Sequence, residues 1–391
     1  MNDVYIITAL RTPFGSFGGN LADLPAPQLA AQVIQKIMER CSLSGEQIDE
    51  VILGQVLQGG MGQAPARQAM RLAELPDSIP AMTINKVCGS GLKAIMLGAD
   101  AVQLGHSKLV IAGGMENMSL APYVLPKARF GQRLGHSQML DLLVYDGLED
   151  PYSKRHMGEI TEDWASKKQL TREAQDEFSA RSYRLSQAAL SNNRFADELI
   201  EVVKKTRKGD ISIVEDEEPL RGSIEKLSTL KPVFAKNGTI TAGNASTIND
   251  GAGIALLASE SAAQRTSLQP VARLVASATN SIHPDLFGEA PVEAIRRCCT
   301  KAGLQTDQIG LFEINEAFAA VPLVAINELN LDPERVNVNG GAVSIGHPIG
   351  ASGARLVATL LREMKARNEK YGLATLCIGG GEAVAAIFEL V

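Results

Sequence analysis

The two halves of this chain carry the same short sequence patterns in the same order, and this internal repeat limits the possible folds more than any other feature. The segment QIDEVILGQ begins at Gln47, and QIGLFEINE begins at Gln308, 261 positions later. SGLKAIMLGADAVQLG begins at Ser90, and SGARLVATLLREMKAR begins at Ser352, 262 positions later. KLVIAGGME then matches ATLCIGGGE further along. The sequence therefore predicts two copies of one structural unit.

Each copy reads as a strand, a turn with Ser-Gly, an amphipathic helix, an apolar strand and a glycine cluster. This alternation predicts an α/β fold. VIAGG and LCIGG are short apolar runs typical of buried strands. The two helices carry apolar residues at helical spacing: Leu92, Ile95, Met96, Ala99 and Val102 in the first, and Leu356, Leu360 and Met364 in the second.

Between the copies, from about Met118 to Ala245, charged and polar residues become more frequent. TREAQDEFSARSYRLSQAAL predicts a helix with Thr171 as its N-cap. The basic run KKTRK, residues 204–208, is interpreted as a surface hairpin in preference to a phosphate contact. We interpret this stretch as an inserted loop domain.

Composition and charge argue against several classes of function. The 391 residues have a formal net charge of −6, which disfavours nucleic-acid binding. Five scattered cysteines without CxxC spacing indicate free thiols in a reducing compartment and predict neither a disulfide framework nor a zinc site. The N-terminus enters a strand-like run with no signal-peptide pattern, and no apolar run is long enough to span a bilayer. We expect a cytoplasmic protein without membrane contact.

The strongest chemical signal is NKVCGSG, residues 85–91, directly before a helical pattern. A cysteine at a glycine-flanked turn into a helix meets free backbone amides and the positive end of the helix dipole, which stabilise a thiolate. Buried structural cysteines are commoner, but a core position would not need glycines around the thiol. We interpret Cys88 as a nucleophile.

The second copy supplies matching groups. Its turn GGAVSIGHPIGASG places His347 opposite Cys88 in the repeat, and a Cys with a facing His forms an activated nucleophile. Asn315 and Glu316 follow the strand-like run LFEI. Cys377 ends the strand LATLCI before three glycines, a placement that favours a second functional thiol over a core residue.

The motifs NKVCGSGLKA, GGMENMS, TAGNASTINDGA, NEAFA, GGAVSIGHPIGASGAR and CIGGG together resemble the thiolase family from residue 4 to the C-terminus. The resemblance implies two βαβαβαββ halves in a five-layered α-β-α-β-α arrangement. It divides the chain into an N-terminal half (1–117 and 246–268), a loop domain (118–245) and a C-terminal half (269–391).

The resemblance also implies roles. Cys88 would carry the acyl group, His347 would activate it, and Cys377 would move the α-proton of the second substrate. Asn315 would hold a water near the enolate, and the amides of Cys88 and Gly379 would form the oxyanion hole. The implied reaction is the reversible condensation of two acetyl-CoA to acetoacetyl-CoA and CoA, with neither a metal nor a redox cofactor.

Further matches concern coenzyme A. Ser246 would lie near the pantetheine amides and Arg221 near a phosphate, although a surface arginine is an equal alternative for Arg221. The pantetheine channel would be lined by Phe234, Ala242, Ala317 and Phe318.

Substrate length and assembly are implied by two neighbouring segments. His156 and Met157 match the HMG element of short-chain biosynthetic thiolases, and ARFGQRLGHSQMLD resembles their tetramerisation loop. We expect a homotetramer built as a dimer of dimers. The chain departs from the usual pattern at Glu382-Ala383, where Met-Gly is common, at Thr247, and in FGEAPVEA around Phe287.

Three alternatives remain open. A broader 3-ketoacyl-CoA thiolase of fatty-acid degradation would use the same residues on longer chains. A decarboxylating ketosynthase would carry a second histidine in place of Cys377. An inactive CoA-binding member of the fold would lack acetyl transfer to Cys88.

Overall fold

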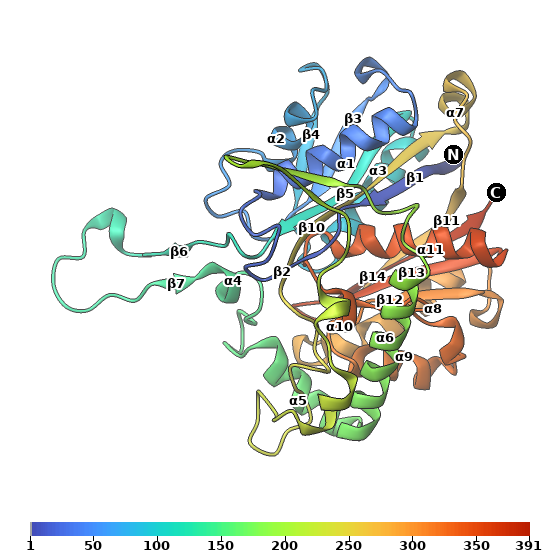
Figure 1. Ribbon diagram of the computed structural model, residues 1–391. Coiled ribbons are helices and arrows are strands. Elements are labelled where there is room, and N and C mark those ends of the chain that lie inside the picture. The colour runs from blue at the N-terminus through green and yellow to red at the C-terminus, as the bar shows by residue number, and fades with distance from the viewer. Residues whose placement is uncertain (1) are drawn as a thin grey trace.

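The computed structural model describes residues 2–391, and a single mixed sheet runs through it (Figure 1). Ten strands belong to this sheet: β1 (Val4–Arg11), β2 (Gly15–Ser16), β3 (Glu50–Gly54), β4 (Ala81–Ile84), β5 (Leu109–Asn117), β10 (Asn249–Ser259), β11 (Ala272–Ser281), β12 (Leu311–Ile314), β13 (Tyr371–Ile378) and β14 (Glu382–Leu390). Two separate hairpins are formed by β6 (Tyr123–Val124) with β7 (Leu140–Asp141) and by β8 (Val202–Thr206) with β9 (Gly209–Ile213).

The α-helices are α1 (Ala26–Arg40), α2 (Pro65–Leu72), α3 (Ser90–Gln103), α4 (Leu142–Tyr145), α5 (Met157–Lys167), α6 (Arg172–Ser191), α7 (Glu260–Thr266), α8 (Ala290–Ala302), α9 (Ala320–Leu329), α10 (Ala342–Ile345) and α11 (Ser352–Arg367).

The sheet has the symmetry that the repeat predicts. Its order is β12-β13-β14-β11-β1-β10-β5-β3-β4, so the strands on either side of the β11–β1 junction follow the same order outward. Pairing directions match as well: β3 with β5 and β12 with β13 are parallel, and the next two pairs in each half are antiparallel. Only Tyr5 with Arg273 and Ile6 with Ala272 pair across the junction.

The repeat extends to single hydrogen bonds. Before β3, the side chain of Gln47 accepts a 2.8 Å bond from the amide of Ser44. Before β12, the side chain of Gln308 accepts a 2.8 Å bond from the amide of Gln305. Each bond caps a short 3₁₀ turn, η1 (Gly45–Gln47) and η6 (Thr306–Gln308).

Five layers result, as expected. Helices α3 and α11 lie between the two half-sheets, and the predicted apolar residues of both helices are buried in one core. A second core lies under α1 and α2 on the outer face of the first half, and a third lies under α8 and α9 on the outer face of the second.

The Ser-Gly pairs explain how α3 and α11 come so close. A Cβ on Gly353 would lie 2.3 Å from the amide nitrogen of Leu92, and one on Gly91 would lie 3.0 Å from that of Ala354. Only glycine permits this approach of two backbones. The crossing brings the N-terminal ends of both helices to one place, where the residues before them meet.

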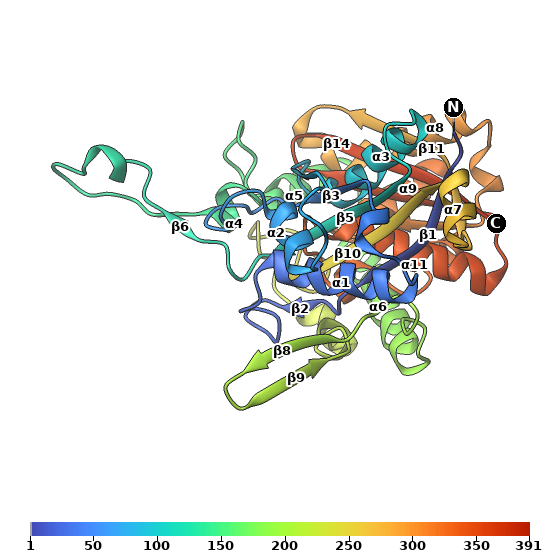
Figure 2. The ribbon, with the colours of Figure 1, turned by 90° about the horizontal axis from the view of Figure 1, so that it is seen from above.

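The inserted stretch lies outside the layers. Thr171 caps α6 through a 3.1 Å bond from the amide of Ala174, as predicted. KKTRK lies in the β8–β9 hairpin, which projects from the body (Figure 2), so the surface-hairpin interpretation is confirmed. The β6–β7 hairpin projects further still (Figure 1). Within residues 2–391, no helix combines the length and apolar character needed to cross a membrane.

Candidate active site

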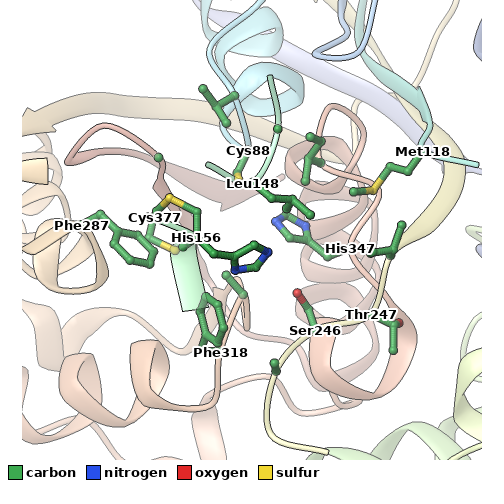
Figure 3. Close-up of a pocket in the computed structure, with 18 of the residues that line it drawn as sticks. Cys88, Met118, Leu148, His156, Ser246, Thr247, Phe287, Phe318, His347 and Cys377 are labelled. Carbon is green, nitrogen blue, oxygen red and sulfur yellow. The ribbon is translucent and has the colours of Figure 1, made fainter. Parts of the chain in front are cut away.

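One cavity of about 370 Å³ lies where the two halves and the inserted stretch meet, and Cys88, His347 and Cys377 all face it (Figure 3). Cys88 comes from the first half, and the other two come from the second. The predicted residues that line the cavity are Cys88, His156, Met157, Phe234, Ala242, Ser246, Ala317, Phe318, His347, Cys377 and Gly379. The fold thus brings these distant segments together.

Cys88 lies on a tight turn before α3. Val87 has a φ of 44°, a left-handed conformation that is strained for a β-branched residue. The hydroxyl of Ser90 accepts a 2.8 Å bond from the amide of Lys86 and donates a 2.7 Å bond to the carbonyl of Val87. The turn therefore holds the nucleophile in one orientation.

The resting state of Cys88 differs from the sequence-based expectation. Burial raises the pKa of its thiol to about 11, although hydrogen bonds from the backbone of Gly379 and from its own backbone act in the opposite direction. The sequence predicts that the helix N-terminus favours a thiolate. In the structure, burial is the largest influence on this pKa and favours a neutral thiol at rest.

His347 lies in the glycine-rich loop between α10 and α11. Its amide donates a 2.9 Å bond to Asn249, and its Nδ1 lies 2.6 Å from the hydroxyl of Ser352. That hydroxyl donates to the carbonyl of Pro348 at 2.9 Å, so it accepts from Nδ1–H. Nε2 is then left with its lone pair. Burial lowers the pKa of His347 to about 3, so the ring is neutral.

Asn315 directly follows β12 and contacts the nitrogen of His347 that Ser352 leaves free. Its Nδ2 lies 3.4 Å from Nε2 of His347, and the residue is fully buried. Asn315 is not among the residues that line the cavity. The structure therefore places it beside His347 and outside the cavity lining.

Two buried glutamates, one from each half, hold the ends of the His347 loop. Glu116, at the end of β5, accepts a 2.9 Å bond from the amide of Gly350. Glu316, just after β12, accepts a 3.1 Å bond from the amide of Val343. Burial raises the pKa of both carboxyls, that of Glu116 to about 7. The His347 loop is thus held in place by residues from both halves.

Cys377 lies at the end of β13 and is 1% exposed. Burial is the main cause that raises the pKa of its thiol, and nearby Cys88 raises it further. Gly379 follows in the turn between β13 and β14. Cys377 is therefore a second neutral thiol beside the first.

The remaining cavity walls are mostly apolar. The ring of His156 stacks on Phe234 with centroids 4.9 Å apart, and its Nδ1 caps α5 by accepting a 3.0 Å bond from Gly158. Phe287 lies in η5 (Pro284–Glu289) and meets Phe318 edge to face at 6.4 Å. The aromatic pair limits the space beside Cys377 (Figure 3).

Arg221 lies outside this cavity. It lines a neighbouring hollow of about 280 Å³ together with Lys226, and Ala242 belongs to both spaces. We call this space the basic hollow. The carboxylate of Glu218 also lines it.

Comparison with known proteins identifies the fold. The sequence profile of the thiolase N-terminal domain matches residues 4–261, and that of the thiolase C-terminal domain matches residues 268–390.

The chain belongs to the thiolase family.

Similar thiolases are known from several bacteria. An acetyl-CoA acetyltransferase of Pseudomonas aeruginosa is 51% identical, with 98% of each chain covered, and one of Cupriavidus necator is 48% identical over the full length of both. A probable acetyl-CoA acyltransferase of Staphylococcus aureus is 46% identical, with 99% of each covered. The crystal structure of the Bacillus anthracis acetyl-CoA acetyltransferase matches with a TM-score of 0.98 at 41% identity, covering 100% of this chain and 99% of that one.

Sequence reasoning missed several parts of this thiolase site. Leu148 and Val233 line the cavity from the inserted stretch, where no motif marks them, and Met118 lines it from within GGMENMS, a motif to which no cavity role was assigned. Ser352 was recognised only as part of the repeat, yet it orients His347. Phe287 was noted as a departure from the family pattern, which was a usable signal for a residue in the cavity wall.

All five cysteines of this thiolase are free of disulfides. Among residues 2–391, no three or more His, Cys, Asp or Glu side chains are grouped so that they could hold a metal ion.

Proposed function

We propose that this thiolase is an acetyl-CoA C-acetyltransferase, which reversibly condenses two acetyl-CoA to acetoacetyl-CoA and CoA. The observation that carries the proposal is the meeting of Cys88, His347, Cys377 and Gly379 around one cavity. The names of relatives at 48–51% identity support the choice of substrate.

The first step is acyl transfer to Cys88. Nε2 of His347 takes the thiol proton as the sulfur attacks the thioester carbonyl, and the amides of Cys88 and Gly379 receive the oxyanion. The imidazolium then gives its proton to the departing CoA sulfur. Both groups start neutral, so no charge is buried before the acyl-CoA arrives.

The second step needs a base at the α-carbon of another acetyl-CoA. The Cys377 thiol passes its proton to His347, and the resulting thiolate removes the α-proton. The imidazolium and an Asn315-bound water stabilise the enolate. Attack on the acetyl group breaks its bond to Cys88, and the imidazolium returns a proton to that sulfur.

Coenzyme A would lie along the cavity with its phosphates toward the basic hollow. Ala242 joins the two spaces, and Ser246 faces the cavity where an amide of the pantetheine arm would pass (Figure 3). Arg221 and Lys226 would then meet phosphate oxygens. A short acyl group fits the volume left by Met157, Phe287 and Phe318.

We also propose a homotetramer assembled through the β6–β7 hairpin, a cytoplasmic location and a role in lipid metabolism. The hairpin carries large exposed side chains, with Phe130 85% and Leu134 100% exposed, which an isolated chain would leave in water.

Peptide mass spectrometry after incubation with acetyl-CoA tests the proposal. One acetyl group per chain should appear on Cys88, and acetoacetyl-CoA should accumulate once CoA is removed. Label on Cys298 or Cys299 in place of Cys88, or no label at all, would contradict the assignment and favour an inactive CoA-binding protein.

A chain-length series tests the substrate range. Thiolysis of 3-ketoacyl-CoA should fall steeply from C4 to C8 and C16, because His156, Met157 and Phe287 enclose the acyl site. Efficient turnover of the C16 compound would place the protein with broad degradative thiolases.

A further inference from the structure

The turn that carries Cys88 and the turn that carries Gly379 belong to opposite halves and touch each other directly. A Cβ on Gly89 would lie 2.4 Å from Cδ1 of Ile378, so the Ile378 side chain packs directly against the backbone of the Cys88 turn. Cys88 and Gly379 both line the cavity at the inner edge of this contact. The acyl transfer step depends on this one juxtaposition.

An ion pair closes the outer edge of the same contact. Nζ of Lys86, two residues before Cys88, lies 2.5 Å from Oε2 of Glu382, three residues after Gly379. The other oxygen of Glu382 accepts a 3.1 Å bond from the hydroxyl of Ser281, at the end of β11. Both charged side chains are only partly exposed, at 21% and 34%.

The two turns differ in stiffness. The Ser90 hydroxyl holds the Cys88 turn by two hydrogen bonds, whereas Gly380 and Gly381 in the Gly379 turn have φ values of 87° and 86°, where glycine moves with little resistance. A cross-link between the turns therefore decides how they sit relative to each other. Glu382 also stands at a position where this chain departs from the usual thiolase pattern.

We propose that Lys86 and Glu382 are positioning residues whose ion pair sets the separation between the Cys88 sulfur and the Gly379 amide. The inference rests on the proposed function, because it concerns the acyl transfer step of that reaction. The pair does not touch the substrate; it acts through the two turns.

The effect on rate should exceed the effect on stability. A partly exposed ion pair contributes little to folding, so variants should fold. Oxyanion stabilisation is sensitive to placement, and a shift of about 1 Å can cost about 100-fold in rate. Neither Lys86 nor Glu382 lines the cavity in which coenzyme A is proposed to bind, so KM should change little.

The experiment compares Lys86→Glu, Glu382→Lys and the double charge swap in the full-length protein. Acetylation of Cys88 by saturating acetyl-CoA is followed by rapid quenching and intact-mass measurement, and KM is measured in steady state. Each single reversal should slow acetylation about 10- to 100-fold with KM within about threefold of wild type. The swap should restore the rate to within about threefold.

Arg273→Glu provides a matched control. Arg273 pairs with Glu389 at 2.5 Å between β11 and β14, at the opposite end of these strands from Ser281 and Glu382. Its reversal should leave acetylation at the wild-type rate. Glu382→Gln, which keeps the side-chain shape, serves if a reversed variant fails to fold, and it should slow acetylation as well.

Single variants that acetylate at the wild-type rate would overturn the proposed role of the Lys86–Glu382 ion pair. So would a folded double swap that is as slow as the slower single variant, since restored pairing would then have no effect. Failure of the wild-type protein to form acetyl-Cys88 would instead contradict the proposed function, and the two failures are thereby distinguished.

Discussion

Cys88 and Cys377 are two thiols in one cavity, yet the proposed chemistry gives them separate tasks. Cys88 is the half-buried end of a strained turn, whereas Cys377 is a buried strand residue. Burial raises the pKa of both, so both start as neutral thiols, and the proposed tasks follow from the position of each sulfur. Substitution of each thiol should therefore stop a different step.

Replacing Cys88 by Ala should abolish acetyl-enzyme formation and condensation together, because the covalent intermediate has no atom on which to form. Replacing Cys377 by Ala should leave acetylation of Cys88 intact, while exchange of the acetyl-CoA methyl protons with deuterated water falls by about 10²- to 10⁴-fold. Mass spectrometry follows both. Unchanged exchange in Cys377→Ala would make Cys377 structural and point to His347 as the base.

Alkylation of the free enzyme should report the neutral state of Cys88. Only a thiolate reacts with iodoacetamide, and a pKa raised to about 11 means that the thiolate fraction grows about tenfold per pH unit from pH 7 to 10. The thiolate fraction at each pH is measured by the rate at which the unmodified Cys88 peptide is lost. A plateau near pH 8.5 would show instead that the helix N-terminus or His347 holds a thiolate in the resting enzyme.

At the scale of elements, the site depends on how closely α3 and α11 cross. The glycines at their first turns allow the backbones to meet, and this places the Cys88 turn against the His347 loop. Gly98, further along α3, faces only side chains, with Val110 and Ala112 at 3.1 and 3.2 Å from an added Cβ. Substitution by alanine should therefore have different effects at a glycine that faces a backbone and at one that faces side chains.

Gly353→Ala should destabilise the fold by about 1–3 kcal/mol, because the new methyl group would lie 2.3 Å from a backbone nitrogen that cannot move aside. Gly98→Ala should be close to neutral, since side chains can shift by a few tenths of an ångström and alanine favours a helix. Thermal unfolding of both variants provides the measurement. Equal Tm values would mean that the crossing is not tightly packed.

The repeat made these elements predictable from the sequence. Matching motifs fixed the paired helices and strands, and glycine-rich turns located Cys88, His347 and Cys377. The neutral state of Cys88 could not be foreseen, because it depends on burial by segments far away in the chain. Arg221 and Asn315 were also harder to place, since their positions depend on packing and not on a local pattern. The boundaries at 117/118, 245/246 and 268/269 stay a prediction.

At the scale of the whole molecule, the β6–β7 hairpin is the feature that a single chain does not explain. It projects from the body and exposes several large apolar side chains, among them Tyr123 and Met139 at 61% and 63%. Exposed apolar surface of this kind typically marks a protein interface.

Phe130→Asp combined with Leu134→Asp should convert the proposed tetramer to dimers, because the charges would have to be buried at the contact. Light scattering coupled to size exclusion gives the mass, and acetylation of Cys88 per chain should be retained. Leu104→Asp, a change at another exposed apolar residue, should leave the mass unaltered. A tetramer that survives the double change would assign assembly to another surface.

The narrow β1–β11 junction also bears on how the protein is made. Because the two half-sheets share only two residue pairs, the first half gains little support from the second until α11 and the last strands have been added. During synthesis, Cys88 leaves the ribosome long before His347, Cys377 and Gly379, and proteins generally fold from the N-terminus as they emerge. A prematurely terminated chain thus presents a cysteine with no base and no complete oxyanion hole. Incomplete chains would not react with acyl-CoA, and only complete chains could consume the acyl-CoA of the cell.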